Sequence, residues 1–114
     1  MITIEKLNTF GANTAEGLAR CFGNEALYLK LVATIPGEGN FDKLKNAIGD
    51  RDFENAFLAA HALKGVLGNL SLTPLYMKVV DITELLRSKT DTDYAPLLSD
   101  ILALQEELGK LCTD

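Results

Sequence analysis

The fold is decided by residues 53–70, which read FENAFLAAHALKGVLGNL. Apolar side chains recur there at steps of three and four, which is the spacing of one face of an α-helix. We expect this helix to begin near Arg51 or Asp52 and to run to about Leu70. Its packed face is predicted to consist of Phe53, Ala56, Ala60, Leu63, Leu67 and Leu70. At about 100° per residue, His61 projects roughly 130° from the middle of that face, so we expect it to be exposed.

The rest of the chain is also predicted to be helical. Residues 13–16, NTAE, resemble a capping box that opens a short helix ending near residue 23, and Asn24 is suited to cap a helix that stops at Pro36. A further short helix should stop at Gly49, and the last two helices should begin at residues 73–74 and near residue 93. The stripes at helical spacing are Leu27, Tyr28, Leu31 and Ile35; Phe41, Leu44, Lys45 and Ile48; Tyr76, Val79, Thr83 and Leu86; and Leu97, Ile101, Leu104, Leu108 and Leu111. Their Leu and Phe residues are expected to form the core.

These elements predict an all-α fold. We expect a four-helix up-down bundle with one or two short extra N-terminal helices. A chain of 114 residues is long enough for one core but not for two. The prediction is therefore a single domain over residues 1–114, with the bundle core at about residues 24–112.

Composition narrows the functional classes. The chain is 47% hydrophobic and 24% charged, with a formal net charge of −5. Because nucleic acid requires a basic face, we expect no nucleic-acid partner. No apolar run approaches the roughly 18 residues needed to span a bilayer, and the N-terminus lacks the layout of a signal peptide. We therefore expect a cytoplasmic protein without membrane contact. In it Cys21 and Cys112 are reduced thiols, although the sequence leaves a disulfide open.

His61 is the single histidine of the chain, and its neighbours give it chemical interest. Imidazole is a suitable nucleophile near neutral pH, because much of it is then neutral. Lys64 lies on the same side of the helix, and Gly65 lies one turn further along. Glycine inside a helix costs about 1 kcal/mol relative to alanine, so Gly65 suggests clearance for a bulky group that approaches the imidazole. Lys64 would then meet negative charge on that group.

Acidic residues avoid this region. None of the 16 Asp and Glu residues falls between Asn55 and Val80, where the only charges are Lys64 and Lys78. Like charges across an interface are costly. A stretch without carboxylates therefore suits a partner with an acidic, phosphate-handling pocket.

Residues 60–70, AHALKGVLGNL, resemble the signature of the histidine-containing phosphotransfer (HPt) domains of bacterial two-component phosphorelays. Residues 20–28, RCFGNEALY, are similar to the family's N-terminal turn and helix, and residues 44–48, LKNAI, to the short helix before the histidine helix. The resemblance covers about residues 12–112. The chain departs from the family at Ser71, where many members have a glycine, and at Val66 and Leu67, where small residues are commoner.

The resemblance implies a phosphocarrier. His61 would take a phosphoryl group from the aspartyl phosphate of a receiver domain and pass it to another receiver aspartate. Lys64 would stabilise the phosphate oxygens, and Gly65 would give access. The implied partners are response-regulator receiver domains and a hybrid sensor histidine kinase; the receiver supplies a divalent metal, so the chain needs no cofactor of its own. By helical position, the docking rim is expected to include Phe57, Leu58, Gly68 and Asn69.

Other interpretations stay open. We expect a monomer. We also expect no kinase activity of the chain's own, because no nucleotide-binding loop is present. The same bundle could instead be the substrate domain of a chemotaxis-type histidine kinase, or an adaptor that only binds receivers. Lys64 could be a lysine that snorkels at the core boundary, and Gly68 could mark the helix end with Asn69. A metal or haem site is not expected, since one histidine and two distant cysteines form no ligand cluster.

Overall fold

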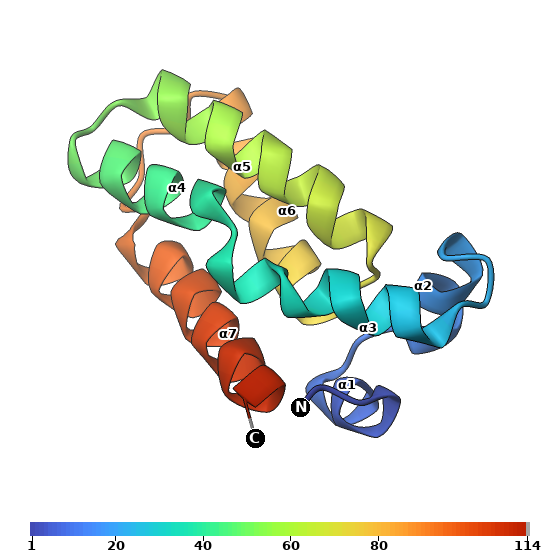
Figure 1. Ribbon diagram of the computed structural model, residues 1–114. Helices are drawn as coiled ribbons and strands as arrows, with labels where there is room; N and C mark the ends of the chain where they lie inside the picture. The colour runs from blue at the N-terminus through green and yellow to red at the C-terminus, as the bar shows by residue number, and fades with distance from the viewer. Residues whose placement is uncertain (114) are drawn as a thin grey trace.

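The computed structural model describes residues 1–113, and within them the chain is helical and has no strand (Figure 1). The elements are α1 (Ile4–Phe10), α2 (Thr14–Arg20), α3 (Glu25–Ala33), the 3₁₀-helix η1 (Ile35–Gly37), α4 (Gly39–Gly49), α5 (Phe53–Asn69), α6 (Thr73–Arg87) and α7 (Ala95–Thr113). The predicted all-α fold is confirmed. In this part of the chain no helix has both the length and the apolar character that a bilayer-spanning segment needs.

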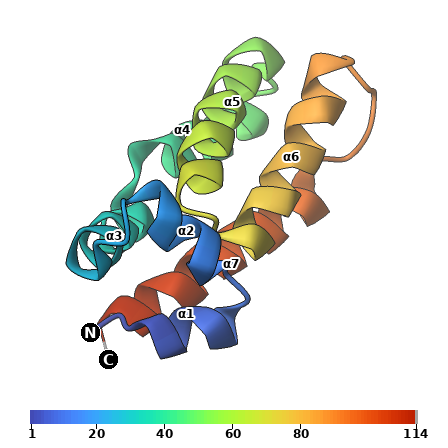
Figure 2. The same ribbon diagram turned by 90° about the vertical axis from the view of Figure 1, so that its right-hand side faces the viewer.

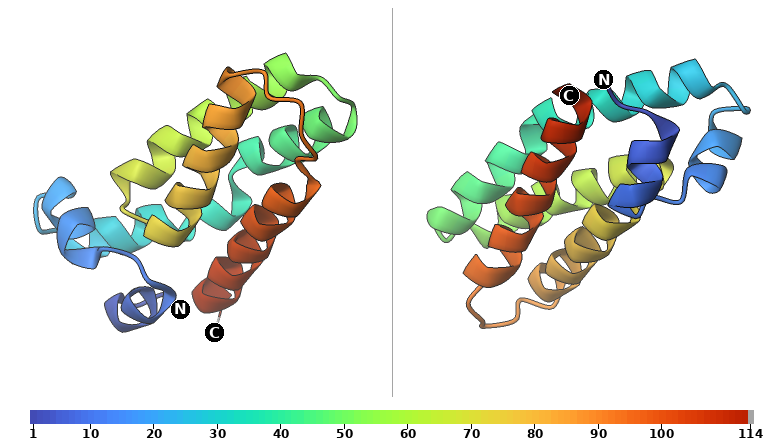
Figure 3. Two further views of the ribbon diagram at one scale, coloured as in Figure 1. Left: turned by 180° about the vertical axis from the view of Figure 1, so that it is seen from behind. Right: turned by 90° about the horizontal axis from the view of Figure 1, so that it is seen from below.

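Helices α4 to α7 form the bundle. Each runs antiparallel to the one before it, which gives the predicted up-down order (Figures 1 and 3). Helix α5 packs on both α4 and α6, and α7 packs on α6 and η1 and touches α4. Between the helices lie large side chains with almost no exposed surface: Phe41, Leu44, Leu63, Leu67, Leu75, Ile82, Ile101 and Leu108. Burial of each contributes roughly 1.5–3 kcal/mol, so this core fixes the position of α5.

Helices α1 to α3, which we call the N-terminal cap, cover the end of the bundle where α5 gives way to α6 (Figure 2). The Tyr28 hydroxyl of α3 donates to the Leu70 carbonyl at 2.9 Å, and the Asn13 N–H donates to the Ser71 carbonyl at 2.9 Å. The sequence located α2 and α3 but not α1. The first and last described turns lie side by side (Figure 3), where the Lys6 ammonium donates to the Met1 carbonyl at 2.8 Å and the Leu111 carbonyl at 3.5 Å.

Capping side chains explain where the helices begin. Asn13 and Asn24 each accept a hydrogen bond from the backbone N–H three residues on, as predicted. Asp52 does the same for α5 through the Asn55 N–H, at 3.2 Å. Hydrogen bonds from Asn55 hold the pKa of the Asp52 carboxyl below its usual range. The capping box at residues 13–16 is only half formed, because the Asn13 N–H bonds to Ser71 instead of Glu16.

Two of the predicted packed faces are wrong in part. Phe53 is exposed, because it is the first residue of α5, and its ring lies beside Arg51 and Tyr94 at the surface. Leu27 and Leu31 of α3 are exposed as well. The buried face of α3 carries Tyr28 and Val32 instead, since this helix lies over the end of the bundle and not along its side. Of the residues on the other stripes, Lys45 is exposed and Tyr76 is half-buried, whereas Ala47, Ala59 and Ile82, outside the stripes, are buried.

Candidate functional site

His61 lies near the middle of α5 and is exposed, as its helical position predicts. Its imidazole is stacked on the ring of Phe57, one turn earlier, with ring centroids 5.9 Å apart and planes inclined by 22°. Side chains of a helix lean toward its N-terminus, which brings residue 61 over residue 57. The inner face of α5, opposite the imidazole, is buried in the bundle core through Ala60, Leu63 and Leu67.

His61 borders a groove of about 610 Å³. Three elements line it. Helix α5 contributes His61, Lys64, Gly65, Gly68 and Asn69; the α5–α6 turn and α6 contribute Ser71, Thr73, Tyr76 and Met77; and α2 contributes Asn13, Glu16 and Arg20. The groove therefore joins the histidine, its lysine and both glycines, with the N-terminal cap as its far wall.

The two glycines of the groove have different surroundings. A Cβ added to Gly65 would meet no atom within 4 Å, so nothing inside the chain requires a glycine there. A Cβ on Gly68 would lie 3.0 Å from the Tyr76 ring, which is tighter than ordinary contact. Gly68 thus permits close packing of α6 on α5. The helix ends at Asn69, so Gly68 lies in its last turn, as one of the two interpretations of this glycine expected, and it also packs against α6.

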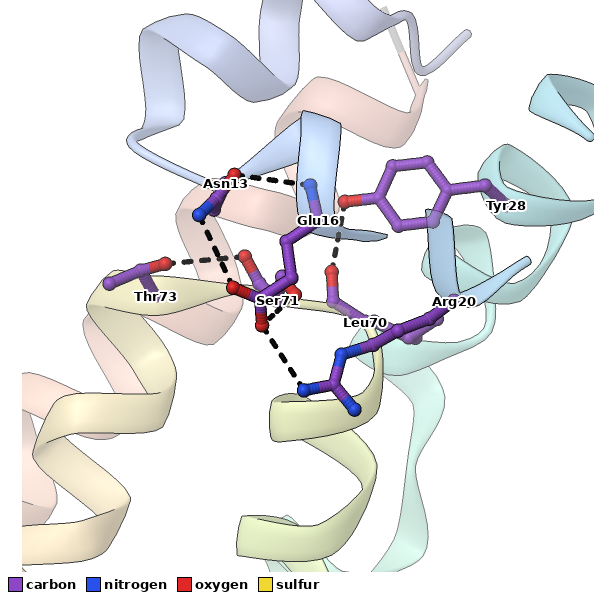
Figure 4. A network of polar contacts seen from close by, with 7 residues as sticks. All are labelled: Asn13, Glu16, Arg20, Tyr28, Leu70, Ser71 and Thr73. Atoms are coloured by element: carbon purple, nitrogen blue, oxygen red, sulfur yellow. Dashed lines mark hydrogen bonds and ion pairs between the residues drawn. The ribbon is translucent and has the colours of Figure 1, made fainter. Parts of the chain in front are cut away.

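Charge around the groove is more mixed than the sequence suggests. The stretch from residue 55 to residue 80 has no carboxylate, but α2 brings Glu16 into the groove wall. Figure 4 shows that this carboxylate is occupied, because it accepts from Arg20 at 3.2 Å, from the Ser71 hydroxyl at 3.1 Å and from the Asn13 amide at 3.4 Å.

The two lysines of the acid-free stretch also differ. Lys78 forms an ion pair with Asp100 at 3.2 Å. Lys64 is half-buried and has no ion-pair partner within residues 1–113. Of the two lysines between residues 55 and 80, Lys64 is therefore the one without an ion-pair partner among residues 1–113.

The rim residues predicted from helical position do not share one groove. Asn69 is exposed in the groove of His61, whereas Phe57 and Leu58 line a second groove of about 760 Å³ with the α6–α7 loop. Leu58 is 58% exposed, and Met77 of α6, which the sequence did not single out, is 61% exposed. Met77 lies outside the packed face of its helix, so its position in the sequence could have predicted an exposed apolar side chain there.

Ser71 ends α5 in a left-handed conformation, with φ of +54°. Its N–H donates to the Gly68 carbonyl, and the Leu72 N–H donates to the Leu67 carbonyl, as in a Schellman ending. Glycine suits this φ best, which accounts for the glycine that the resemblance leads one to expect here. Ser71 is buried, and its hydroxyl donates a hydrogen bond to the Glu16 carboxylate, which a glycine could not make.

The remaining reactive side chains form no further site. Cys21 is buried and Cys112 is half-buried, and both are free thiols, as expected. Across residues 1–113 there is no group of three or more His, Cys, Asp or Glu side chains that could hold a metal ion.

The family model of the Hpt domain matches residues 37–114. The chain belongs to the Hpt domain family. Members of this family carry phosphoryl groups on histidine in phosphorelays and typically interact with the receiver domains of two-component systems. The match begins at Gly37, the last residue of η1, so it includes α4 to α7 and leaves out α1 to α3. No match to the chain is found among curated proteins or among solved structures.

Proposed function

We propose that His61 of this Hpt domain is the phosphoryl acceptor of a phosphorelay. A lone pair of the imidazole attacks the phosphorus of a receiver aspartyl phosphate, and an N–P bond forms. The P–O bond to the aspartate breaks, and its electron pair leaves on the carboxylate. The second ring nitrogen gives its proton to solvent, and the reverse steps pass the group to another receiver.

The observation that carries this proposal is the open space at Gly65 beside an exposed imidazole. Phosphoryl transfer depends mainly on bringing the two groups into line and on balancing charge. A receiver aspartate lies in a pocket, so the imidazole has to enter it without a clash from the helix that carries it. A glycine one turn from His61, with no internal contact to make, leaves that room.

Lys64 is proposed to stabilise the phosphate oxygens. It lies in the same groove as His61, three residues on, and its charge is not matched by an ion pair within residues 1–113. The receiver would supply the divalent metal, as the resemblance to the family implies.

The docking surface is proposed to surround His61 on α5 and α6. Leu58 and Met77 expose apolar area beside it, and Phe57 and Asn69 complete the rim on α5. Gly68, predicted as a rim residue, is better explained by its packing against Tyr76. We further propose that residues 1–114 act as one domain, as a monomer in the cytoplasm, with a hybrid sensor kinase upstream and no kinase activity of the chain's own.

The test is transfer from a radiolabelled, phosphorylated receiver domain to the purified chain. We expect acid-labile, alkali-stable label on the wild type and none on His61→Gln, which has no second histidine to substitute. Lys64→Ala should slow transfer by roughly tenfold, less than the loss of a buried oxyanion donor because Lys64 is partly in solvent. Lys78→Ala is the matched control, since Asp100 already pairs with that lysine, and it should leave the rate unchanged. Label on His61→Gln would overturn the proposal.

A further inference from the structure

Three side chains form a continuous stack across α5 and α6. The His61 ring lies on the Phe57 ring, with centroids 5.9 Å apart, and the Arg87 guanidinium lies over the same Phe57 ring, 5.2 Å from its centroid. Arg87 is itself held by Glu84, at 3.5 Å between Nε and the carboxylate. Phe57 is half-buried, and its ring contacts both the His61 imidazole and the Arg87 guanidinium.

The Phe57 ring is the aromatic surface against which the imidazole lies. In residues 1–113 no hydrogen bond or ion pair is made by the His61 side chain. An exposed imidazole without other contacts would sample several rotamers, and few of them would direct a ring nitrogen outward. A flat aromatic surface restricts the ring plane but leaves the ring edge free.

We propose that Phe57, supported by Arg87, is a positioning residue that holds the His61 imidazole in the orientation needed for phosphoryl transfer. This inference rests on the proposed function and assigns Phe57 a role beyond contact with the receiver. Part of the orientational cost of transfer is then met before the receiver arrives. Arg87 acts on His61 only through the Phe57 ring.

Helix α5 offers a matched pair for comparison. Near its N-terminus Arg51 lies over the Phe53 ring at 5.8 Å, which repeats the cation and the aromatic ring without a histidine. Phe53 contacts Tyr94 instead, with ring centroids 5.4 Å apart. Phe53→Leu therefore removes a similar ring from the same helix and leaves the imidazole untouched.

The first experiment is NMR of the His61 ring protons in wild type, Phe57→Leu, Phe57→Tyr and Phe53→Leu. Because the chain has one histidine, its imidazole signals need no further assignment. An upfield ring-current shift should be present in wild type, Phe57→Tyr and Phe53→Leu and lost in Phe57→Leu. The absence of any shift in the wild type would overturn the inference.

The second experiment measures kcat and KM for transfer from the phosphorylated receiver, and chemical labelling by phosphoramidate. We expect Phe57→Leu to lower kcat about tenfold with little change in KM, Arg87→Gln to lower kcat less, and Phe57→Tyr to restore it. Phosphoramidate reacts without docking, so its labelling rate should stay near that of wild type. Arg51→Gln and Phe53→Leu should change neither constant.

The outcomes separate this inference from the function on which it rests. A rise in KM alone on Phe57→Leu would make Phe57 a simple docking residue and overturn the positioning role, while the proposed phosphocarrier would stand. A wild type that accepts no label from any receiver, yet reacts with phosphoramidate, would overturn the proposed function itself. The ring-current shift would still report whether the stack exists in solution.

Discussion

The middle of α5 and its C-terminal turn both contain glycines and polar side chains, but these are open to solvent in the middle of the helix and packed or hydrogen-bonded at its end. Around His61 the helix displays an imidazole and a lysine that form no hydrogen bond or ion pair within residues 1–113, and a glycine with empty space beside it. Around Ser71 the backbone and side-chain polar groups bond to the N-terminal cap. The glycines nearby are closed by aromatic rings, Gly17 of the cap by Tyr28 and Gly68 of α5 by Tyr76. The first region leaves polar groups open to a partner, and the second uses its polar groups in hydrogen bonds within the chain.

The strongest way to test this contrast is Gly17→Ala. A Cβ at Gly17 of α2 would lie 2.5 Å from the buried Tyr28 ring, so the cap has to shift. Forced overpacking of this kind costs about 1–3 kcal/mol, more than alanine gains as a helix former. Urea unfolding should show the loss, and Gly49→Ala, which meets no atom within 4 Å, is the matched control. Equal stability of the two variants would contradict the closed packing.

A smaller effect is expected from Tyr28→Phe, which removes the hydroxyl that donates to Leu70. The loss should be about 1 kcal/mol near neutral pH, with the Leu70 carbonyl left unpaired. Burial, and to a lesser degree the nearby Cys21 thiol, raises the pKa of Tyr28 from 10.0 to about 12. A raised pKa of the folded state gives stability that is complete below pH 10 and is lost as the pH rises toward 12.

The alkaline behaviour provides a second measurement on the same variant. The difference in unfolding free energy between wild type and Tyr28→Phe should shrink as the pH is raised from 8 to 11. Only the wild type has the Tyr28 phenol, which ionises more easily in the unfolded chain, whereas Tyr94, whose pKa burial also raises, is present in both proteins and cancels from the difference. A difference that stays constant over this range would show that Tyr28 is not buried as described.

Gly65→Ala tests the open region and should separate stability from function. Alanine should stabilise the fold by up to about 1 kcal/mol, since the added Cβ meets nothing. Transfer from a phosphorylated receiver should nevertheless slow, because the methyl group occupies the clearance beside His61. Thermal unfolding and transfer rate, measured together, check this. A destabilised variant would assign Gly65 an internal role.

The smallest net effect is expected from Ser71→Gly. Glycine relieves a left-handed backbone that costs an L-residue roughly 1 kcal/mol, but it also deletes the bond to Glu16, worth a similar amount. The two should nearly cancel in the wild type. In a Glu16→Ala background the bond is already absent, so the same change should stabilise the fold. A double-mutant cycle by urea unfolding measures this, and equal effects in both backgrounds would contradict it.

Local features of the chain could be predicted from the sequence. The apolar spacing of residues 53–70 locates α5 and the exposed side of His61, and the capping residues Asn13 and Asn24 locate the starts of α2 and α3. These depend on neighbours within one or two turns, which periodicity describes well.

The contacts between distant segments could not be predicted in this way. Glu16 reaches Ser71 across 55 residues, so nothing near either one indicates that α2 forms a wall of the histidine groove. The role of Gly68 depends on how closely α6 approaches α5, and the stack of Arg87 on Phe57 depends on the same packing. The prediction that Phe53 is packed was wrong, because the spacing of apolar residues does not show that the first residue of a helix can lie beyond the edge of the core.

The meeting of the first and last described turns, bridged by Lys6, has a consequence for chain topology. Because these turns are adjacent, a short linker could join them, and the chain could be reopened in the α6–α7 connection at residues 88–94. Such a circular permutant would keep α5, α6 and the N-terminal cap in their present order. The histidine helix would then be the last but one in the chain, followed only by α6 before the new C-terminus.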